Sequence, residues 1–329
     1  MSMNSRPENV RITGIGSALV DLLIHENDDF LENLGKKKGG MTLVGDSEIQ
    51  AILEKTSQDP AVVSGGAACN TLVGIGRLGG QARFIGQRGQ DSYGDLFDRH
   101  LKQAGVEPVL SRSETPTGKV LSVITPDAQR SMFTFLGAAS ELSPESISPD
   151  LFRDTAIVMV EGYLLFNRDL MLAALKSARA AGAKIALDLA SFEVVEASRP
   201  ILGDLVADFV DILIANEDEA RAYTGHSDEA KALEVLARNV SVAVLKVGKR
   251  GSYLSSGNET LRIEPVAGRE ARDTTGAGDL WAAGFLYGLA HGYSMERSGR
   301  IASACGYEVC QVIGAHIPEA GWERVRRLL

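Results

Sequence analysis

The sequence predicts an α/β protein with a mainly parallel sheet, because short apolar strands alternate with helical segments over most of its 329 residues. Residues 168–182 have helical periodicity and end at Gly182, and residues 217–225 predict a shorter helix. Helical crossovers of this kind are what parallel strands require. The strand-like runs that flank these helices lie at residues 155–165, 184–190, 211–216 and 241–248.

The N-terminal third has the same rhythm, with a strand-like run at 9–24, a helical pattern at 67–79 and a strand candidate at 82–87. Two segments break it. Residues 27–43 are polar and rich in glycine and lysine, and residues 116–136 alternate like an antiparallel hairpin that turns near Pro126. Such a flap on a parallel body often acts as a lid that excludes water. The alternative is a surface hairpin without a role.

Composition excludes several classes of protein. A formal charge of −9 and a pI near 5.2 argue against nucleic-acid binding. We find no run long enough for a membrane span and no signal-peptide pattern in the N-terminal residues. The cysteines, Cys69, Cys305 and Cys310, lack metal-site spacing and suit free thiols. We therefore expect a cytoplasmic protein with a small-molecule partner and with neither a nucleic-acid nor a membrane partner.

The stretch "DTTGAGD" at residues 273–279 combines glycines and a carboxylate at the mouth of a helix that we predict to start at Asp279. Gly276 and Gly278 let backbone N–H groups turn toward one point, where the helix dipole favours an anion. Asp279 could simply cap the helix, but a cap needs no glycine turn before it. Anion-binding amides beside a carboxylate suit transfer of a phosphoryl group to a hydroxyl, because the carboxylate can accept the hydroxyl proton.

The same stretch resembles the C-terminal signature of the PfkB/ribokinase family of small-molecule kinases. Residues 64–80, "SGGAACNTLVGIGRLGG", resemble the family's N-terminal signature, and residues 85–106 resemble the segment that comes after that signature in the family. "NEDE" at residues 216–219 is similar to its N-x-x-E motif, and residues 245–254 resemble its nucleotide-side strand and glycine turn. The P-loop pattern G-x-x-x-x-G-K-S/T is absent, so ATP must bind through this other architecture.

The resemblance implies a ribokinase-like three-layer fold in which helices flank a mainly parallel central sheet and a small antiparallel β-flap forms a lid. It implies one kinase domain over residues 1–329, with lid segments at approximately 18–45 and 108–137 inserted in the α/β body. The expected activity is ATP-dependent transfer of the γ-phosphate to a hydroxymethyl group of a nucleoside or sugar, by a monomer or a homodimer.

The family's catalytic roles fall on two parts of the sequence. Asp279 would be the general base, and the amides of Gly276, Ala277 and Gly278 would form the anion hole. Arg130, in the predicted flap, resembles an arginine that folds over the phosphates, where its planar fork of donors would serve. As a lone arginine it could equally be a solvated side chain.

The nucleotide and metal roles fall on the last third of the chain. Asn216 and Glu219 would position Mg²⁺, mainly through water, although "NEDE" could also be a solvated acidic start to a helix. The resemblance also implies K⁺ near the anion hole, where Asp273 either shapes the loop or helps to seat the cation. The residues expected to contact ATP are Asn216, Lys246, Gly248, Gly251, Thr275 and Gly278.

For the acceptor, Asp21 is the one charge in an apolar stretch and corresponds to a carboxylate that grips sugar hydroxyls in the family. Gly65, Gly66 and Asn70 match the substrate-side signature, with glycines for close approach and an amide for paired hydrogen bonds. Asn70 could instead cap the helix after it.

Residues 125–145, 160–166 and 187–195 resemble adenosine-kinase-type members, so adenosine is the preferred acceptor. The alternatives are a ribokinase, or a kinase of fructose or ketodeoxygluconate, and a non-catalytic nucleoside- or sugar-binding protein on the same fold. The partial glycine pattern "GIGSAL" is better explained by strand packing than by a dinucleotide site. Side chains that could face a purine, or only pack the flap and core, are Met132, Phe133, Phe135 and Phe192.

Overall fold

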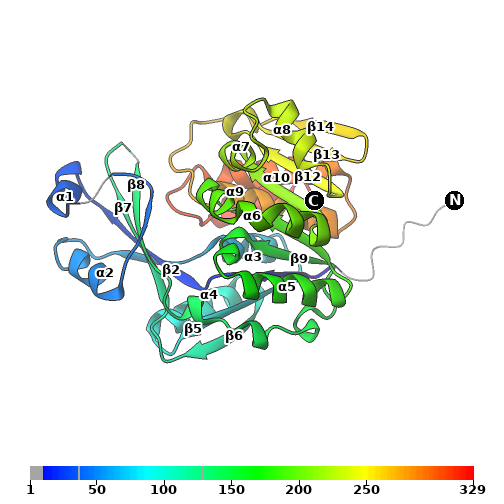
Figure 1. Ribbon diagram of the computed structural model, residues 1–329. Helices are drawn as coiled ribbons and strands as arrows, with labels where there is room; N and C mark the ends of the chain where they lie inside the picture. The colour runs from blue at the N-terminus through cyan, green and yellow to red at the C-terminus, as the bar shows by residue number, and fades with distance from the viewer. Residues whose placement is uncertain (1–9, 36–37, 128) are drawn as a thin grey trace.

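The computed structural model describes residues 10–35, 38–127 and 129–329, which form a layered body and a smaller projecting sheet (Figure 1). The body contains a nine-stranded sheet that is parallel except for its last two strands. In spatial order the strands are β6 (Val106–Ser113), β5 (Ala82–Gly89), β1 (Ile12–Ile15), β9 (Ile157–Glu161), β10 (Lys184–Asp188), β11 (Ile212–Asn216), β12 (Val242–Lys246), β13 (Ser252–Ser256) and β14 (Glu259–Ile263).

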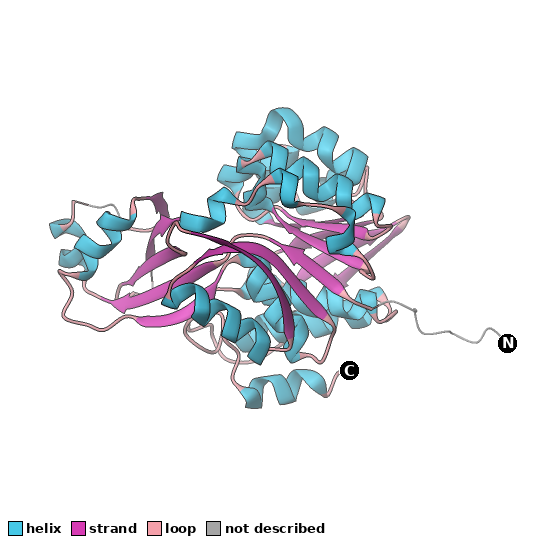
Figure 2. Ribbon diagram, turned by 90° about the horizontal axis from the view of Figure 1, so that it is seen from below, coloured by secondary structure: helices cyan, strands magenta, loops and turns pink. Residues whose placement is uncertain are grey.

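Helices cover both faces of this sheet (Figure 2). Alternate residues of β9 point to opposite faces, so that Ile157 packs into one core and Val158 into the other. Both cores are apolar, as buried parallel strands require. One core includes α3 (Ala67–Arg77), α4 (Ser92–Gln103), α9 (Ala277–Ala290), α10 (Met295–Val309) and α11 (Glu319–Arg326). The other includes α5 (Arg168–Ala180), α6 (Phe192–Phe209), α7 (Glu217–Thr224) and α8 (Glu229–Leu236). The predicted three-layer α/β fold is confirmed.

Short 3₁₀ helices connect several of these elements. They are η1 (Gly137–Glu141), η2 (Pro144–Ser146), η3 (Pro149–Phe152), η4 (Gly162–Phe166) and η5 (Gly248–Arg250). Two of them come directly after strands of the large sheet, since η4 begins after β9 and η5 lies between β12 and β13.

The second sheet has five strands and projects from the body at the left of Figure 1. Its order is β3 (Met41–Leu43), β8 (Arg130–Phe135), β7 (Gly118–Ile124), β2 (Leu19–His25) and β4 (Ala61–Gly65). The β7–β8 pair is the predicted antiparallel hairpin, whereas β2 runs parallel to β7. The expected lid segments were residues 18–45 and 108–137. The second sheet differs from them in two ways, because it also includes β4, and because residues 106–113 belong to β6 of the body.

One face of the second sheet is covered and the other is open toward the body. Leu22, Leu121 and Phe133 form a core with α1 (Asp28–Asn33) and α2 (Asp46–Leu53). Because side chains alternate along each strand, Asp21 and Met132 lie on the opposite face. This uncovered face approaches the loop after α10, since a Cβ atom on Gly314 would lie 3.6 Å from Leu23, and Gly314 N donates to Asp273, just before α9.

The described part of the chain has no helix that is both long and apolar enough to cross a membrane. Cys69, Cys305 and Cys310 are free thiols, as their spacing predicted.

Candidate active site

Polar side chains end four consecutive parallel strands of the body. Glu161 ends β9, Asp188 ends β10, Asn216 ends β11 and Lys246 ends β12. Glu161 and Asp188 are register partners, as are Asn216 and Lys246. The carboxyl edge of an open parallel sheet is where such folds bind ligands, and this row therefore marks the candidate active site.

The helix α9 begins at this edge with a glycine turn. Gly276 is its N-cap and has a left-handed φ of 71°, and a Cβ atom there would lie 2.6 Å from Ala315. The helix starts at Ala277, two residues before the predicted start, because Gly276 already closes the turn. Within the described residues, the N–H groups of Gly276, Gly278 and Asp279 have no hydrogen-bond acceptor. The N–H of Ala277 donates to Thr274 O at 3.1 Å and is therefore less available than expected.

Asp273 fixes the shape of this turn. Its Oδ1 accepts from Thr275 N at 3.0 Å and from Thr275 Oγ1 at 2.7 Å, and its Oδ2 accepts from Gly314 N at 2.7 Å. Burial acts to raise the pKa of Asp273, but these hydrogen bonds outweigh it and hold that pKa below its usual value. The Thr275 amide donates within the turn, and a contact between Thr275 and ATP stays a prediction.

Asp279 lies in the first turn of α9, against the first turns of α3. Asn70 Nδ2 donates to Asp279 Oδ2 at 2.9 Å, and Thr71 Oγ1 donates to the backbone oxygen of Asp279 at 3.1 Å. Asn70 does not cap α3, because Gly66 occupies that position. Burial raises the pKa of Asp279 to about 7, although the Asn70 hydrogen bond lowers it. A carboxyl with this pKa is suited to accept a proton near neutral pH.

Lys246 is the one cationic side chain among the four polar residues that end these strands, and its ammonium group lies at the start of α9. Its Nζ lies 3.0 Å from Asp188 Oδ2, and a Cβ atom on Gly278 would lie 3.1 Å from the same Nζ. Burial alone would lower the pKa of Lys246, but the charges of Asp188 and Glu219 outweigh it and raise that pKa.

Asn216 and Glu219 form a capping box at the start of α7. Asn216 Oδ1 accepts from Glu219 N at 2.9 Å, and Glu219 Oε2 accepts from Asn216 N at 2.7 Å. Burial raises the pKa of Glu219, against the opposing charge of Lys246. The pair therefore starts a helix, although Glu219 is buried rather than solvated, and its role toward Mg²⁺ stays a prediction.

The oxygen donors of this pair fit a water-mediated magnesium ion better than a direct one. Among the residues that the structure describes, no three His, Cys, Asp or Glu side chains are grouped as a metal cage. Mg²⁺ keeps several waters and binds few protein carboxylates directly, so one carboxylate and one amide oxygen beside a phosphate site match its preference.

The glycine turn after β12 has the conformation that its sequence requires. Gly248 has a φ of 55° and Gly251 a φ of 96°. A Cβ atom on Gly251 would lie 2.1 Å from Ile263 O, so no larger residue fits. Gly248 is exposed and lies two residues after Lys246, at the edge where the polar row ends.

Asp21, Gly65 and Gly66 form a wall opposite α9. A Cβ atom on Gly65 would lie 2.5 Å from Asp21 Oδ1, and one on Gly66 would lie 2.5 Å from Ser17 O, so both glycines permit close approach. Burial raises the pKa of Asp21 to about 6, and the positive charge of Arg130 acts in the opposite direction.

Arg130 points from the second sheet toward the space between Asp21 and α9. Its charge lowers the pKa of both Asp21 and Asp273, which places the guanidinium within electrostatic reach of both walls. Its Nε is buried and has no hydrogen-bond partner within the described residues. A buried donor without a partner is costly, and an anion between the two sheets would satisfy it.

Of the side chains that could face a purine, Phe133 is buried in the core beneath α1 and α2, and Phe135 packs against that core. For these two residues the core-packing alternative holds, because strand alternation turns them away from Asp21. Met132 lies on the same strand face as Arg130, and Phe192, at the start of α6, is 43% exposed.

Three sets of contacts were not predicted from sequence. Glu161 is buried and accepts from Ser17 N at 2.9 Å and from Ala68 N at 3.1 Å, joining the β1–β2 corner to α3. Asp188 pairs with Lys246. Glu161 and Asp188 are each the single acidic residue at the end of an apolar strand, and this pattern could have identified them from the sequence. His100 hydrogen-bonds Ser64, and its ring lies 5.7 Å from that of His316.

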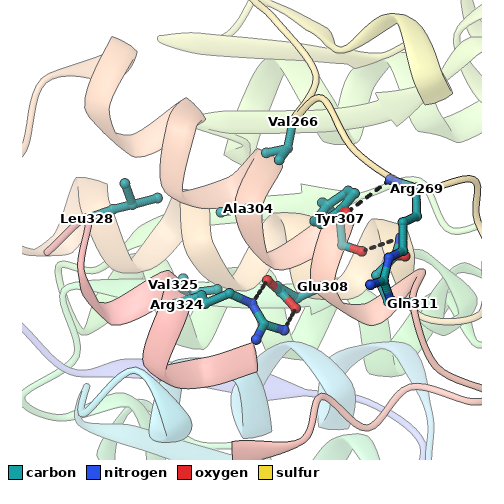
Figure 3. Close-up of a pocket in the computed structure, with 9 residues that line it drawn as sticks. All are labelled: Val266, Arg269, Ala304, Tyr307, Glu308, Gln311, Arg324, Val325 and Leu328. Carbon is teal, nitrogen blue, oxygen red and sulfur yellow. Dashed lines mark hydrogen bonds and ion pairs between the residues drawn. The ribbon is translucent and has the colours of Figure 1, made fainter. Parts of the chain in front are cut away.

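A separate pocket of about 570 Å³ lies between the loop after β14, the outer face of α10, and α11 (Figure 3). Glu308 accepts from Arg324 Nε at 2.5 Å and Nη2 at 2.6 Å within it, and Tyr307 accepts from Arg269 N at 3.1 Å. None of the predicted site residues lines this pocket. It is therefore distinct from the polar row and the α9 turn.

The fold, and the Asp279 carboxylate in the first turn of α9, are those expected of an ATP-dependent phosphotransferase that acts on a hydroxyl group. The chain belongs to the pfkB family of carbohydrate kinases, whose family model matches residues 34–320. It is thus an ATP-dependent kinase of a nucleoside or a sugar.

Known relatives differ in their acceptors. The crystal structure of adenosine kinase from Sinorhizobium meliloti superposes with a TM-score of 0.89 at 32% identity, covering 97% of this chain and 99% of that one. A probable sugar kinase protein from Rhizobium etli also gives 0.89, at 30% identity and the same coverage. The 5-dehydro-2-deoxygluconokinase of Shouchella clausii is 30% identical over 73% of this chain and 78% of its own length. These relatives support the class of reaction and leave the acceptor open.

Proposed function

We propose that the protein transfers the γ-phosphoryl group of ATP to the hydroxymethyl group of a nucleoside, with adenosine as the preferred acceptor. The observation that carries the proposal is the position of Asp279, a carboxyl with a pKa of about 7 beside unpaired amides at the start of α9. A base and an anion site within one helical turn serve both ends of a phosphoryl transfer.

In this mechanism Asp279 accepts the proton of the acceptor hydroxyl while that oxygen attacks the γ-phosphorus. Asn70 holds Oδ2 of the carboxylate and leaves Oδ1 toward the acceptor. Asp21 and the close-packed Gly65 and Gly66 bind the other acceptor hydroxyls. This arrangement fixes the hydroxyl relative to the base, which lowers the entropic part of the barrier.

The phosphate charge is stabilised from several directions. The amides of Gly276 and Gly278 donate from the start of α9. Lys246 supplies positive charge from the body, and Arg130 supplies it from the second sheet. Preorganised donors of this kind are each worth about 3 kcal/mol in related chemistry. The backbone of Gly248 and Gly251 borders the remainder of the nucleotide.

Asn216 and Glu219 would hold Mg²⁺ through water, and the bound ion would neutralise charge on the β- and γ-phosphates. For K⁺ the candidate place is the loop that Asp273 anchors. A comparison of turnover in KCl and in choline chloride at equal ionic strength tests it. Equal rates in the two salts would remove K⁺ from the proposal.

We further propose one kinase domain in which the second sheet is the lid. Its open face carries Asp21 and Arg130 and looks toward α9, so closure would remove water from the reacting groups. Hydrogen exchange of β7 and β8 with and without ATP and acceptor tests this, and unchanged exchange would count against a lid.

Adenosine is supported by the 32% identity to the Sinorhizobium meliloti kinase over nearly the whole of both chains. Phe192 and Met132 offer exposed or partly exposed apolar surface near the site. A sugar acceptor is the second candidate, and the relatives from Rhizobium etli and Shouchella clausii favour it.

The test is a coupled ADP-release assay with ATP and a panel of adenosine, other nucleosides, ribose, fructose, ketodeoxygluconate and 5-dehydro-2-deoxygluconate. We expect adenosine to have the highest kcat/KM. A clearly higher kcat/KM for a sugar would replace the nucleoside with that sugar. Acceptor binding without ADP release across the panel would instead indicate a non-catalytic binding protein.

A further inference from the structure

The carboxylate of Asp188 makes a separate contact through each oxygen. Oδ2 lies 3.0 Å from Lys246 Nζ, and Oδ1 accepts from Ala190 N at 3.1 Å. Asp188 is buried at the end of β10, in the middle of the polar row. Ala190 has a left-handed φ of 65°, an uncommon conformation for a residue with a Cβ atom, and the Oδ1 hydrogen bond helps to hold it.

The Lys246 ammonium lies at a helix N-terminus, which disfavours a cation, and among carboxylates, which favour it. Its Nζ lies 3.1 Å from the place that a Cβ atom on Gly278 would take, at the positive end of α9. A helix N-terminus repels cations, and two other carboxylates, Glu219 and Asp279, act on Lys246 from nearby. Without a fixed partner the flexible lysine chain could turn toward either of them.

We propose that Asp188 is a positioning residue for phosphoryl transfer, which holds the Lys246 ammonium beside Gly278, where the γ-phosphate would lie. This inference rests on the proposed function, and it adds a role for Asp188 that the site residues predicted from sequence do not include. Asp188 acts through Lys246, because its side-chain hydrogen bonds within the described residues go to Lys246 and Ala190.

The structure offers a substitution that separates the two contacts. In Asp188→Asn the side-chain oxygen can still accept from Ala190 N, while the amide group cannot pair with an ammonium. Asp188→Ala removes both contacts. Both variants remove the charge that pairs with the Lys246 ammonium, and we expect Asp188→Ala to lower the melting temperature more than Asp188→Asn, which keeps the Ala190 contact.

The test is a double-mutant cycle of Asp188→Asn and Lys246→Met, measured as kcat in the ADP-release assay. We expect Asp188→Asn alone to lower kcat roughly 10²-fold by misplacing the ammonium, with a much smaller change in the KM of the acceptor. In the Lys246→Met background the same substitution should change kcat by no more than about twofold. Equal losses in the two backgrounds would overturn the proposal.

Two controls exclude other roles. Asp211 accepts from Ile185 N at 2.8 Å at the opposite end of the same strands, and Asp211→Asn should leave kcat unchanged. Recovery of Asp188→Asn activity at tenfold higher Mg²⁺ would assign Asp188 to the metal and overturn the inference.

The same double-mutant cycle can be measured as the affinity for ATP by calorimetry, which needs no acceptor. We expect Asp188→Asn to weaken ATP binding only where Lys246 is present, and additive effects would contradict that. If the wild type binds ATP but phosphorylates nothing, the proposed function fails while the binding cycle still decides the role of Asp188.

Discussion

Asn70 Nδ2 donates a hydrogen bond of 2.9 Å to Asp279 Oδ2, and so joins two residues 209 positions apart in the sequence. Asn70 belongs to the glycine signature near the N-terminus and Asp279 to the glycine turn near the C-terminus. The contact places the acceptor wall and the anion site on either side of one carboxylate.

This hydrogen bond lowers the pKa of Asp279, so its loss should raise that pKa above its present value of about 7. Because the base must be ionised, activity rises with pH through this pKa, and Asn70→Ala should move the acidic limb of the kcat profile to higher pH. The measurement is kcat between pH 5.5 and 9. Asn167→Ala, which removes the N-cap of α5, should leave the limb in place. An unmoved limb in Asn70→Ala would contradict the assignment of the base.

Asp279 also links stability to pH. Its pKa is raised from 3.8 to about 7 on folding, so the folded protein keeps a proton that the unfolded chain releases between these values. The contribution of Asp279 to stability is therefore fully present below pH 4 and is lost as the pH rises through 7. Asp279→Asn should stabilise the protein at pH 8 by on the order of 2 kcal/mol, with no gain at pH 4. Denaturant unfolding at the two pH values measures this, and a destabilised variant at pH 8 would contradict it.

Asp273 should matter for a different reason. It accepts three hydrogen bonds, from Thr275 N, Thr275 Oγ1 and Gly314 N, and Asp273→Ala leaves these donors without their partner. We expect a loss of about 1–3 kcal/mol in stability and a higher KM for ATP, because the anion turn loosens. Asp273→Asn, which can still accept one of the bonds, should lie between the alanine variant and the wild type. Wild-type stability of Asp273→Ala would show that the turn holds without it.

The lowered pKa of His100 should make the stability of the folded protein sensitive to acid. Burial, together with His316 and Arg77, lowers its pKa to about 4. As pH falls from 6.5 toward 4, the unfolded chain binds a proton that the folded protein resists, so stability falls. His100→Gln should reduce the difference between the melting temperatures at pH 7 and pH 5 by about 2–4 °C. An unchanged difference would assign the acid sensitivity to other groups.

The fold was predictable from sequence because its signals are local. Apolar runs of strand length alternate with helical periodicity, and Gly182 and the hairpin lie where the pattern places them. The contacts of Glu161 with Ser17 and Ala68, and of Asp188 with Lys246, were not predictable, since these partners lie far away in the sequence. Alternation in β8 predicted two faces but not which one looks toward the body. The sequence therefore left Phe133 either facing a purine or packing the core, and it packs the core. The start of α9 at Ala277 depends on the left-handed turn at Gly276, which a residue pattern alone does not specify.

The most direct test of the proposed mechanism is the turnover number of Asp279→Asn with the best acceptor of the panel. The substitution keeps the size of the side chain and a hydrogen-bond acceptor for Asn70, and it removes only the base. We predict that kcat falls by ~10²–10⁴ while ATP binding, measured by calorimetry, is retained. Wild-type turnover in this variant would contradict the account.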